Sequence, residues 1–289
     1  MSRTYHLVHT TRYEYEAPVE RSYGRAHLLP SDSDRQRVLD RELEISPVPS
    51  DTNDHLDYFG NISTFYLVRR PHTTLTVTAR SRLLVDRPRP DVAQLDTLTW
   101  EDVRDSLAES PAIAEYRLAS PRARASTEVT TYARSIFTPS RPFGSALVEL
   151  TRRIHSDFSY ETGATTVYTT PAQLLRKRAG VCQDFTHLAV AALRSVGLAG
   201  RYVSGYLETQ PPAGQAKLQG ADASHAWPAA YAPGHGWVDF DPTNDQWVDE
   251  RYLVVATGRD YGDVPPLKGI IVTDSKKSTM QVSVDVNPV

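Results

Sequence analysis

The sequence contains few of the residues that cross-link a chain or bind a structural metal. It has one cysteine, Cys182, and two methionines in 289 residues. One cysteine excludes an intrachain disulfide and a zinc site built from several cysteines, and it is compatible with a reducing compartment. No apolar run approaches the ~20 residues of a membrane-spanning helix, and residues 1–6 lack the apolar core of a secretion signal. We therefore expect a cytoplasmic protein that does not enter a membrane.

The chain also lacks a strong charge of either sign. Its 32 Lys and Arg residues against 35 Asp and Glu residues give a net charge of −3, without a long run of one sign. Nucleic acids and anionic membranes attract proteins through concentrated positive charge, so neither is an expected partner. The scattered His and Asp residues do not show the spacing of metal ligands, such as two histidines one helical turn apart. We expect no metal and no cofactor.

The first part of the chain has the alternating pattern of β-strands. Apolar and polar residues alternate along Leu75, Val77 and Ala79, as a half-buried strand requires. A second alternating segment contains Leu39 and Ile45 on either side of Leu43. We therefore predict an all-β domain over residues 1–86, and such regions most often form an antiparallel sandwich.

Several tyrosines of this region allow two interpretations. Their rings could line a binding surface, or they could form ordinary cross-strand pairs with solvated hydroxyls, which is the interpretation we favour. The residues concerned are Tyr5, Tyr13, Tyr15 and Tyr23.

The pattern changes at residues 87–90, whose sequence is Arg-Pro-Arg-Pro. Two prolines in four residues exclude regular hydrogen-bonded structure, so we place a domain boundary there. Residues 87–289 form the second predicted domain, with a core over about residues 143–256. Its helix signals are Thr99 with Asp102 three residues later, an apolar face beginning near Phe143, and proline after Thr170.

Two further segments are predicted after the core helices. Residues 209–220 contain two prolines and a glycine and are predicted to be an exposed loop. Such a loop could border a cleft, although a plain surface excursion is the interpretation we favour. Residues 280–286 alternate between apolar and polar types and are predicted to form a strand.

The lone cysteine lies at the beginning of a predicted buried helix. Gly180 allows a sharp turn before it, and Gly197 stops the helix. Between them, apolar residues recur with the three-and-four spacing of a buried helix face: Phe185, Leu188, Ala189, Ala192, Leu193 and Val196. A cysteine is more often a small buried apolar residue than a nucleophile. At a helix N-terminus, however, unpaired N–H groups and the helix dipole favour a thiolate.

A predicted hairpin downstream supplies a histidine and an acid. Two strand-like segments, residues 222–227 and 236–243, are joined by a Pro-Gly-His-Gly turn. If residues 232–236 form the loop, Tyr231 pairs with Trp237, and His225 then lies diagonal to Asp241 on the same face of the sheet. The side chains of His225 and Asp241 are therefore predicted to touch.

Neighbouring residues offer alternatives to this assignment. Asp239 shares the predicted face and is a rival partner for His225. His187 lies five residues after Cys182, about 140° around the helix, and so points elsewhere. His235 lies in the hairpin turn and is predicted to be solvated. Two tryptophans on the same face could form an acyl channel or simply pack across the strands: Trp227 and Trp237.

A helix-N-terminal cysteine followed by a histidine and an aspartate is the order of a thiol acyl-transfer site. The segments Gly-Val-Cys, His-Ala-Trp and Trp-Val-Asp-Phe-Asp-Pro-Thr resemble the transglutaminase-like superfamily. Residues 57–61 and 258–264 resemble the bacterial branch that carries its own N-terminal β domain. The resemblance implies an α+β fold with a papain-like core preceded by an antiparallel β domain. It also places the acid in the Asp-Pro-Thr unit, which favours Asp241 over Asp239.

The expected chemistry follows from these three residues. Cys182 would attack an amide or ester carbonyl, His225 would protonate the departing amine, and Asp241 would fix the tautomer of the histidine. The Cys182 N–H is the natural first oxyanion donor, and the sequence identifies no second one. Resemblance to protease-like bacterial proteins favours hydrolysis of a peptide or isopeptide bond in a peptide or protein substrate.

Two other functions remain open at this stage. An amine instead of water could resolve the thioester, as in transglutamination or N-acyl transfer. A non-catalytic peptide-binding module could also keep the fold, but it would not need all three residues. The sequence specifies neither the substrate nor the oligomeric state.

Overall fold

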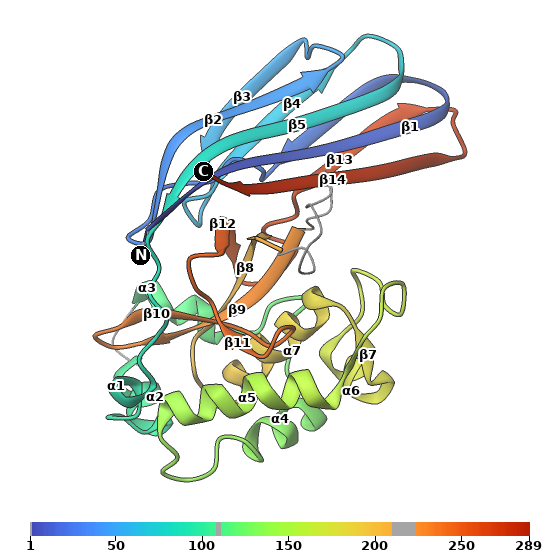
Figure 1. Ribbon diagram of the computed structural model, residues 1–289. Coiled ribbons are helices and arrows are strands. Elements are labelled where there is room, and N and C mark those ends of the chain that lie inside the picture. Colours follow the sequence, from blue (N-terminus) through green and yellow to red (C-terminus); the bar gives the residue numbers. More distant parts are fainter. Residues whose placement is uncertain (1, 108–110, 210–223) are drawn as a thin grey trace, which may run out of the picture.

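The computed structural model describes residues 2–107, 111–209 and 224–289 (Figure 1). The described elements form two bodies that lie one above the other in Figure 1. The upper body consists of long antiparallel strands, and the lower one combines a five-stranded sheet with helices. The α+β fold predicted from the sequence is confirmed. The predicted loop over residues 209–220 falls almost entirely outside the described residues.

The upper body is a seven-stranded antiparallel sheet organised around its first strand. The pairing order is β2-β5-β1-β4-β3, and two strands from the end of the chain also pair with β1. The strands are β1 (Arg3–Ala26), β2 (Gln36–Ser46), β3 (Asp51–Leu56), β4 (Ile62–Val68), β5 (His72–Val85), β13 (Leu267–Thr273) and β14 (Ser278–Pro288).

Strand β1 is long enough to have different neighbours along its two halves. Its first half pairs with β5 and β14, its second half pairs with β4 and β13, and the β5 ladder shifts register between Glu14 and Val19. The structure therefore contains one continuous sheet where the sequence indicated a sandwich. The reason is that a single 24-residue strand belongs to both halves. As predicted, Leu75, Val77 and Ala79 of β5 are buried in its core.

The alternation predicted around Leu43 holds for only part of β2. A β-bulge shifts the β2–β5 register between Val38 and Asp40, and Leu39 is consequently 40% exposed while Ile45 is buried. An extra residue at a bulge reverses which side chains face the core. Alternation read from the sequence cannot detect such a reversal.

The lower body begins with helices whose N-termini follow the predicted signals. Thr99 and Asp102 form a capping box at the start of α2, and Thr170 and Gln173 form another at α6. Helix α5 begins at Phe143 as predicted. The helices are α1 (Val92–Leu95), α2 (Trp100–Ser106), α3 (Pro111–Ala114), the 3₁₀ helix η2 (Glu115–Arg117), α4 (Thr127–Arg134), α5 (Phe143–Asp157), α6 (Pro171–Lys177) and α7 (Cys182–Ser195).

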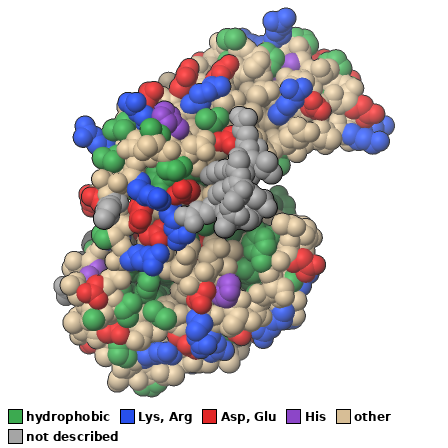
Figure 2. Space-filling view, viewed as in Figure 1, with side chains coloured by type: hydrophobic (Ala, Val, Ile, Leu, Met, Phe, Trp, Pro, Cys, Tyr) green, Lys and Arg blue, Asp and Glu red, His purple; other side chains and the backbone are tan. Residues whose placement is uncertain are grey.

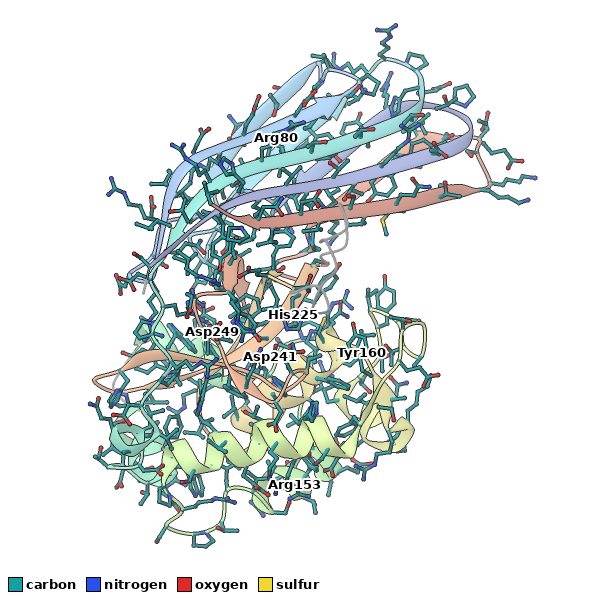
Figure 3. All side chains as sticks on the ribbon, in the orientation of Figure 1. Arg80, Arg153, Tyr160, His225, Asp241 and Asp249 are labelled. Atoms are coloured by element: carbon teal, nitrogen blue, oxygen red, sulfur yellow. The ribbon has the colours of Figure 1, made fainter. Side chains whose placement is uncertain are left out.

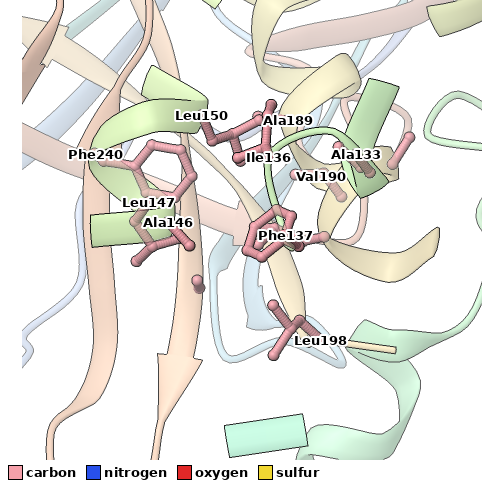
Figure 4. Close-up of a cluster of buried hydrophobic side chains, with 14 of the residues drawn as sticks. Ala133, Ile136, Phe137, Ala146, Leu147, Leu150, Ala189, Val190, Leu198 and Phe240 are labelled. Atoms are coloured by element: carbon pink, nitrogen blue, oxygen red, sulfur yellow. The ribbon is translucent and has the colours of Figure 1, made fainter. Parts of the chain in front are cut away.

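The second sheet lies beside α7. Its pairing order is β11-β10-β9-β8-β12, and all of these pairs are antiparallel. Its strands are β8 (Gly200–Leu207), β9 (Ser224–Ala232), β10 (Gly236–Asp241), β11 (Gln246–Trp247) and β12 (Tyr252–Gly258), while β6 (Ser159–Tyr160) and β7 (Ala179–Gly180) form a separate short pair. Buried side chains from α4, α5, α7 and β10 meet in the main core (Figure 4). This core fixes α7 against the strands that carry the hairpin.

The two sheets are joined by packing and by two side-chain amides. Apolar residues of β1, β5 and β14 are buried against β8 and β12. At the outer edge of β12, Gln36 bonds both the N–H and the C=O of Val254, and Asn61 does the same for Thr257, at 2.8–2.9 Å. These amides take the place of a neighbouring strand, so the edge of β12 is paired without a further strand.

The C-terminal strands differ from the predicted domain division. Residues 280–286 form a strand as predicted, but β13 and β14 belong to the sheet of β1 rather than to the second body. In Figure 1 the blue β1 and the red β14 run side by side, with the N and C labels close together. No described helix is long and apolar enough to cross a membrane. On the face shown in Figure 2, acidic and basic side chains are interspersed.

Candidate active site

The turn before α7 is built to present Cys182 at the start of the helix. Val181 is the N-cap residue and Cys182 the first helical residue. The carboxylate of Asp184 accepts hydrogen bonds from the Val181 N–H at 2.9 Å and the Thr165 hydroxyl at 2.6 Å. A Cβ atom at Gly180 would come within 2.9 Å of that carboxylate, so a larger residue there would displace Asp184. The cysteine is thus held by a cap that the sequence analysis did not include.

The thiol lies in a partly buried aromatic setting. Cys182 packs against a cluster formed by Tyr202, Ala226, Ala256 and Val264. Tyr160, on the short strand β6, is exposed on the same side, and burial together with the nearby Cys182 raises its pKa. The Thr186 hydroxyl donates to the Cys182 carbonyl at 2.8 Å. Cys182 is thus partly exposed while it packs against this cluster.

The predicted hairpin register is confirmed. Tyr231 pairs with Trp237, and the ladder continues to Asp239 opposite Ala229. Beyond that pair the strands no longer form a ladder, yet His225 Nε2 and Asp241 Oδ2 are 2.7 Å apart (Figure 3). The structure therefore brings together the two side chains that the register predicted to touch.

Asp241 is fully buried, and both of its carboxylate oxygens accept hydrogen bonds. Its Oδ1 accepts from the N–H of Thr243 at 2.9 Å. Its Oδ2 accepts from Asn244 Nδ2 at 2.6 Å and from the Tyr252 hydroxyl at 2.7 Å, in addition to His225. Hydrogen bonds of this kind hold a buried carboxylate in its ionised form and in one orientation.

Asn244 and Tyr252 were not among the predicted residues. Asn244 follows Asp241 by three residues in a turn, a spacing that allows a local contact. Tyr252 lies on β12, and strand pairing in the sheet brings it to Asp241. No local sequence motif predicts this contact.

The electrostatics of the histidine favour its charged form. Burial lowers the pKa of His225, but the charge and hydrogen bond of Asp241 outweigh it. With a hydrogen bond and charge from Cys182 added, the pKa of His225 rises to about 10. Burial opposes the charge of Asp241 too, but His225, Asn244 and Tyr252 hold its pKa below the ordinary value. Because Nε2 faces Asp241, the ring nitrogen left for Cys182 is Nδ1.

The rival residues have other partners. Asp239 accepts from Trp227 Nε1 at 3.1 Å and lies 3.8 Å from Arg201, so it orients those side chains. His187 is buried, accepts the Tyr261 N–H at 3.2 Å, and burial lowers its pKa to about 3. It is a structural histidine of the interior.

The two tryptophans pack against other side chains, and His235 lies in a turn. Trp227 is fully buried and stands edge-on to Tyr252, so it packs in the core. Trp237 contacts Tyr116, and Arg201 lies over its ring at 4.5 Å. His235 is in the turn after β9, as predicted. Packing across the strands therefore explains both tryptophans.

The two flanking motifs connect the site to the first sheet. Asp57 accepts from the N–H groups of Phe59 and Asn61, which places Asn61 on the edge of β12. In the second motif, Asp260 accepts the Arg122 N–H, and the Tyr261 N–H reaches His187 on α7. Both motifs act as connectors between elements.

Comparison with known families agrees with the arrangement of the two bodies. A model described as the bacterial transglutaminase-like N-terminal region matches residues 5–83, and one described as the transglutaminase-like superfamily matches residues 130–242. The chain belongs to the transglutaminase-like superfamily. The first match covers β1–β5 up to Leu83, and the second includes Cys182, His225 and Asp241.

Several similar proteins match this chain over nearly its whole length. An uncharacterized protein of Mycobacterium tuberculosis is 44% identical over 290 residues, covering 98% of this chain and 92% of its own. One from Mycobacterium leprae is 37% identical over 265 residues, covering 91% of both chains. A solved structure from Cytophaga hutchinsonii, described as a "putative cysteine protease", superposes with a TM-score of 0.78 at 20% identity, covering 98% and 91%. That likeness concerns the fold.

A metal centre has no evident place in the described part of the chain. Among residues 2–107, 111–209 and 224–289, no group of three or more His, Cys, Asp and Glu side chains could hold an ion. Near Cys182, His225 and Tyr252 instead bond the buried carboxylate of Asp241.

Proposed function

We propose that the protein is a thiol acyl-transfer enzyme that hydrolyses peptide or isopeptide amide bonds. The observation that carries this proposal is the 2.7 Å contact between His225 Nε2 and Asp241 Oδ2. Cys182 is close enough to His225 to help raise the pKa of the imidazole. Together they form the order nucleophile, base and orienting acid that thiol acyl transfer needs. The fold likeness to the Cytophaga hutchinsonii protein supports the same class.

The first half-reaction forms a thioester. The Cys182 thiolate attacks the carbonyl carbon of the substrate amide, and the developing oxyanion is stabilised by the Cys182 N–H, which has no helical acceptor at the first position of α7. The carbon–nitrogen bond then breaks, and the departing amine takes the proton of the His225 imidazolium. Asp241 holds the ring so that Nδ1 faces the sulfur.

The second half-reaction regenerates the thiol. Water attacks the thioester carbonyl while the neutral His225 accepts its proton, and the carbon–sulfur bond breaks to release a carboxylic acid. The returning imidazolium again pairs with the thiolate. An amine in place of water would give a new amide, and the products distinguish the two reactions.

Mass spectrometry of the intact protein tests this function. The full chain is incubated with a library of peptides and glutamine amides, with and without a primary amine, beside the Cys182→Ala and His225→Ala variants. We expect an acyl adduct on Cys182 and a carboxylic acid product, both absent in Cys182→Ala. Amine-linked products in place of acids would assign amine transfer. Absence of adduct and product from the whole library would contradict the proposal.

A further inference from the structure

The first sheet contains a cavity lined by aromatic side chains. It has a volume of about 190 Å³ and lies where β13 and β14 pair with different halves of β1. Tyr13, Tyr15 and Tyr66 form much of its wall, and the rest of the lining combines apolar residues such as Leu75 and Ile271 with the polar residues Ser22, Lys268 and Ser278. A cavity of about 150 Å³ with apolar walls is known to hold a benzene ring. The space therefore suits one aromatic side chain.

The tyrosines of this wall have unused hydrogen-bonding groups. Tyr15 and Tyr66 are 9% and 3% exposed, and within the described residues neither hydroxyl has a hydrogen-bond partner. Burial raises the pKa of both, so both remain neutral phenols. Gly24 leaves the space that the Tyr66 ring occupies, because a side chain there would collide with it. Both tyrosines line the cavity, so a ligand with polar groups can form hydrogen bonds with these hydroxyls.

The cavity lies on the face of β1 that leads to the candidate active site. On this face, Leu7 is buried against the second sheet, and the His9 Nδ1 accepts from the Tyr206 hydroxyl at 2.8 Å. Tyr206 pairs with Ser224, the neighbour of His225. At roughly 3.3 Å per residue, Tyr13 lies about 13 Å further along the strand than His9. An extended peptide covers that distance of about 13 Å in roughly four residues.

Strand β14 adds apolar side chains beside this part of β1. Opposite Thr11 and Tyr13, β14 presents Val282 and Met280, which are both exposed. On the other side, Tyr261 packs against the cluster that contains Cys182 and lies 6.3 Å from Tyr202 between ring centroids. Burial, and then the nearby Tyr261, raise the pKa of Tyr13.

We propose that this cavity is a substrate subsite that takes an aromatic side chain of the peptide, several residues away from the bond broken at Cys182. The inference rests on the proposed function and adds the substrate class: peptides with an aromatic residue at a fixed distance from the scissile amide. The ring is held by the tyrosine wall, and the free hydroxyls bond to polar groups of the peptide. The N-terminal sheet is then the part of the molecule that selects the substrate.

Two neighbouring isoleucines of β13 provide a matched test. Ile271 lines the cavity, whereas Ile270, the next residue, is 72% exposed and is not part of the lining. Binding of N-acetyl-tyrosinamide to the full-length Cys182→Ala protein is measured by NMR. We expect Ile271→Trp to weaken binding at least tenfold and Ile270→Trp to leave it unchanged. Tyr66→Phe, which keeps the volume and removes one hydroxyl, should weaken binding about threefold to tenfold.

The outcomes separate this inference from the proposed function. The subsite would be overturned if both isoleucine variants still bind the probe as the parent protein does. It would also be overturned if the protein binds a methyl glucoside but not the aromatic probe. Peptides with tyrosine or alanine at each of several distances from the amide are then compared as acyl donors for the protein with Cys182 intact. We expect tyrosine at one distance to raise kcat/KM, and Ile271→Trp to abolish this advantage. Acylation of Cys182 without any such preference would leave the proposed function standing and remove the subsite. Probe binding without acylation by any peptide would remove both.

Discussion

The most constrained residue of the candidate site is Asp241, whose four hydrogen bonds leave it a single orientation. Its position explains why two aspartates on one face of a strand can have different roles. Asp239 lies two residues earlier, where it accepts a hydrogen bond from Trp227 and pairs with Arg201. Both acids lie on the same face of the strand, so alternation alone does not show which one contacts His225. The distance from each carboxylate to the imidazole does.

Replacement of Asp241 and replacement of Asp239 should affect the acylation rate to very different extents. We expect Asp241→Asn to fold and to lower the rate of Cys182 acylation by roughly 10³-fold to 10⁴-fold, because an amide can stabilise the wrong tautomer of His225. Asp239→Asn should change the rate less than tenfold, since an amide oxygen can still accept from Trp227. Single-turnover acylation rates for both variants check this. The reverse ranking would show that Asp239 is the orienting acid.

The raised pKa of His225 predicts a wide pH range for the ion pair. The imidazolium is kept up to about pH 10, so the acylation step that needs its proton should continue through neutral pH and fall as the pH rises through about 10. Because the folded pKa exceeds the ordinary 6.5, the contribution to stability is complete below pH 6.5 and is lost as the pH rises through about 10. Imidazole NMR signals of the wild type measure the titration directly. A midpoint near 6.5 that Asp241→Asn does not alter would contradict it.

At the scale of elements, β12 depends on side chains of the other sheet. Gln36 and Asn61 bond its outer edge as a strand would, and β12 carries Tyr252 to Asp241. The site is therefore supported from the first body, although none of the three candidate catalytic residues belongs to it.

Loss of one of these amides should be costly. We expect Asn61→Ala to reduce the free energy of unfolding by about 2–4 kcal/mol, because the N–H and C=O of Thr257 lose their partner. Asn53→Ala, on exposed β3, is the matched control and should change it by less than about 0.5 kcal/mol. Denaturant unfolding of both variants gives the comparison. Equal stability of the two variants would show that water replaces the amide.

The elements differ in how far the sequence predicts them. The hairpin register follows from its turn, because Pro233 to Gly236 fix which residues pair. The exposed Leu39 does not follow, since the bulge beside it depends on the partner strand. The site shows the same division. Cys182, His225 and Asp241 stand out in short motifs, whereas Tyr252 and Asp184 are recognised only when distant segments are brought together.

At the scale of the whole molecule, the segment between the bodies is packed rather than loose. Arg87 is buried, and Arg89 Nη2 lies 2.9 Å from Asp249 on the second body. The proposed domains, 1–86 and 87–289, are therefore tied at this segment. Strands β13 and β14 cross back to the first sheet as well.

This packing predicts cooperative behaviour. We expect subtilisin to leave residues 87–90 uncut in the native protein, because a protease needs an accessible and flexible segment. Unfolding should be a single transition, with far-UV circular dichroism and tryptophan fluorescence coinciding. The four tryptophans all belong to the second body, while circular dichroism also reports the first sheet. Cleavage at this segment, or two separated transitions, would instead show independent domains.

The pairing of β1 with β14 has a consequence for biosynthesis. Ribosomes make β1 long before β14, so β1 can pair with β5 early, but its opposite edge stays open while the second body is being translated. Contacts between such distant parts of a chain form slowly. A chain truncated before β14 would already contain Cys182, His225 and Asp241, but its first strand would have an unpaired edge. An unpaired strand edge is prone to aggregation, so pairing with β14 protects β1.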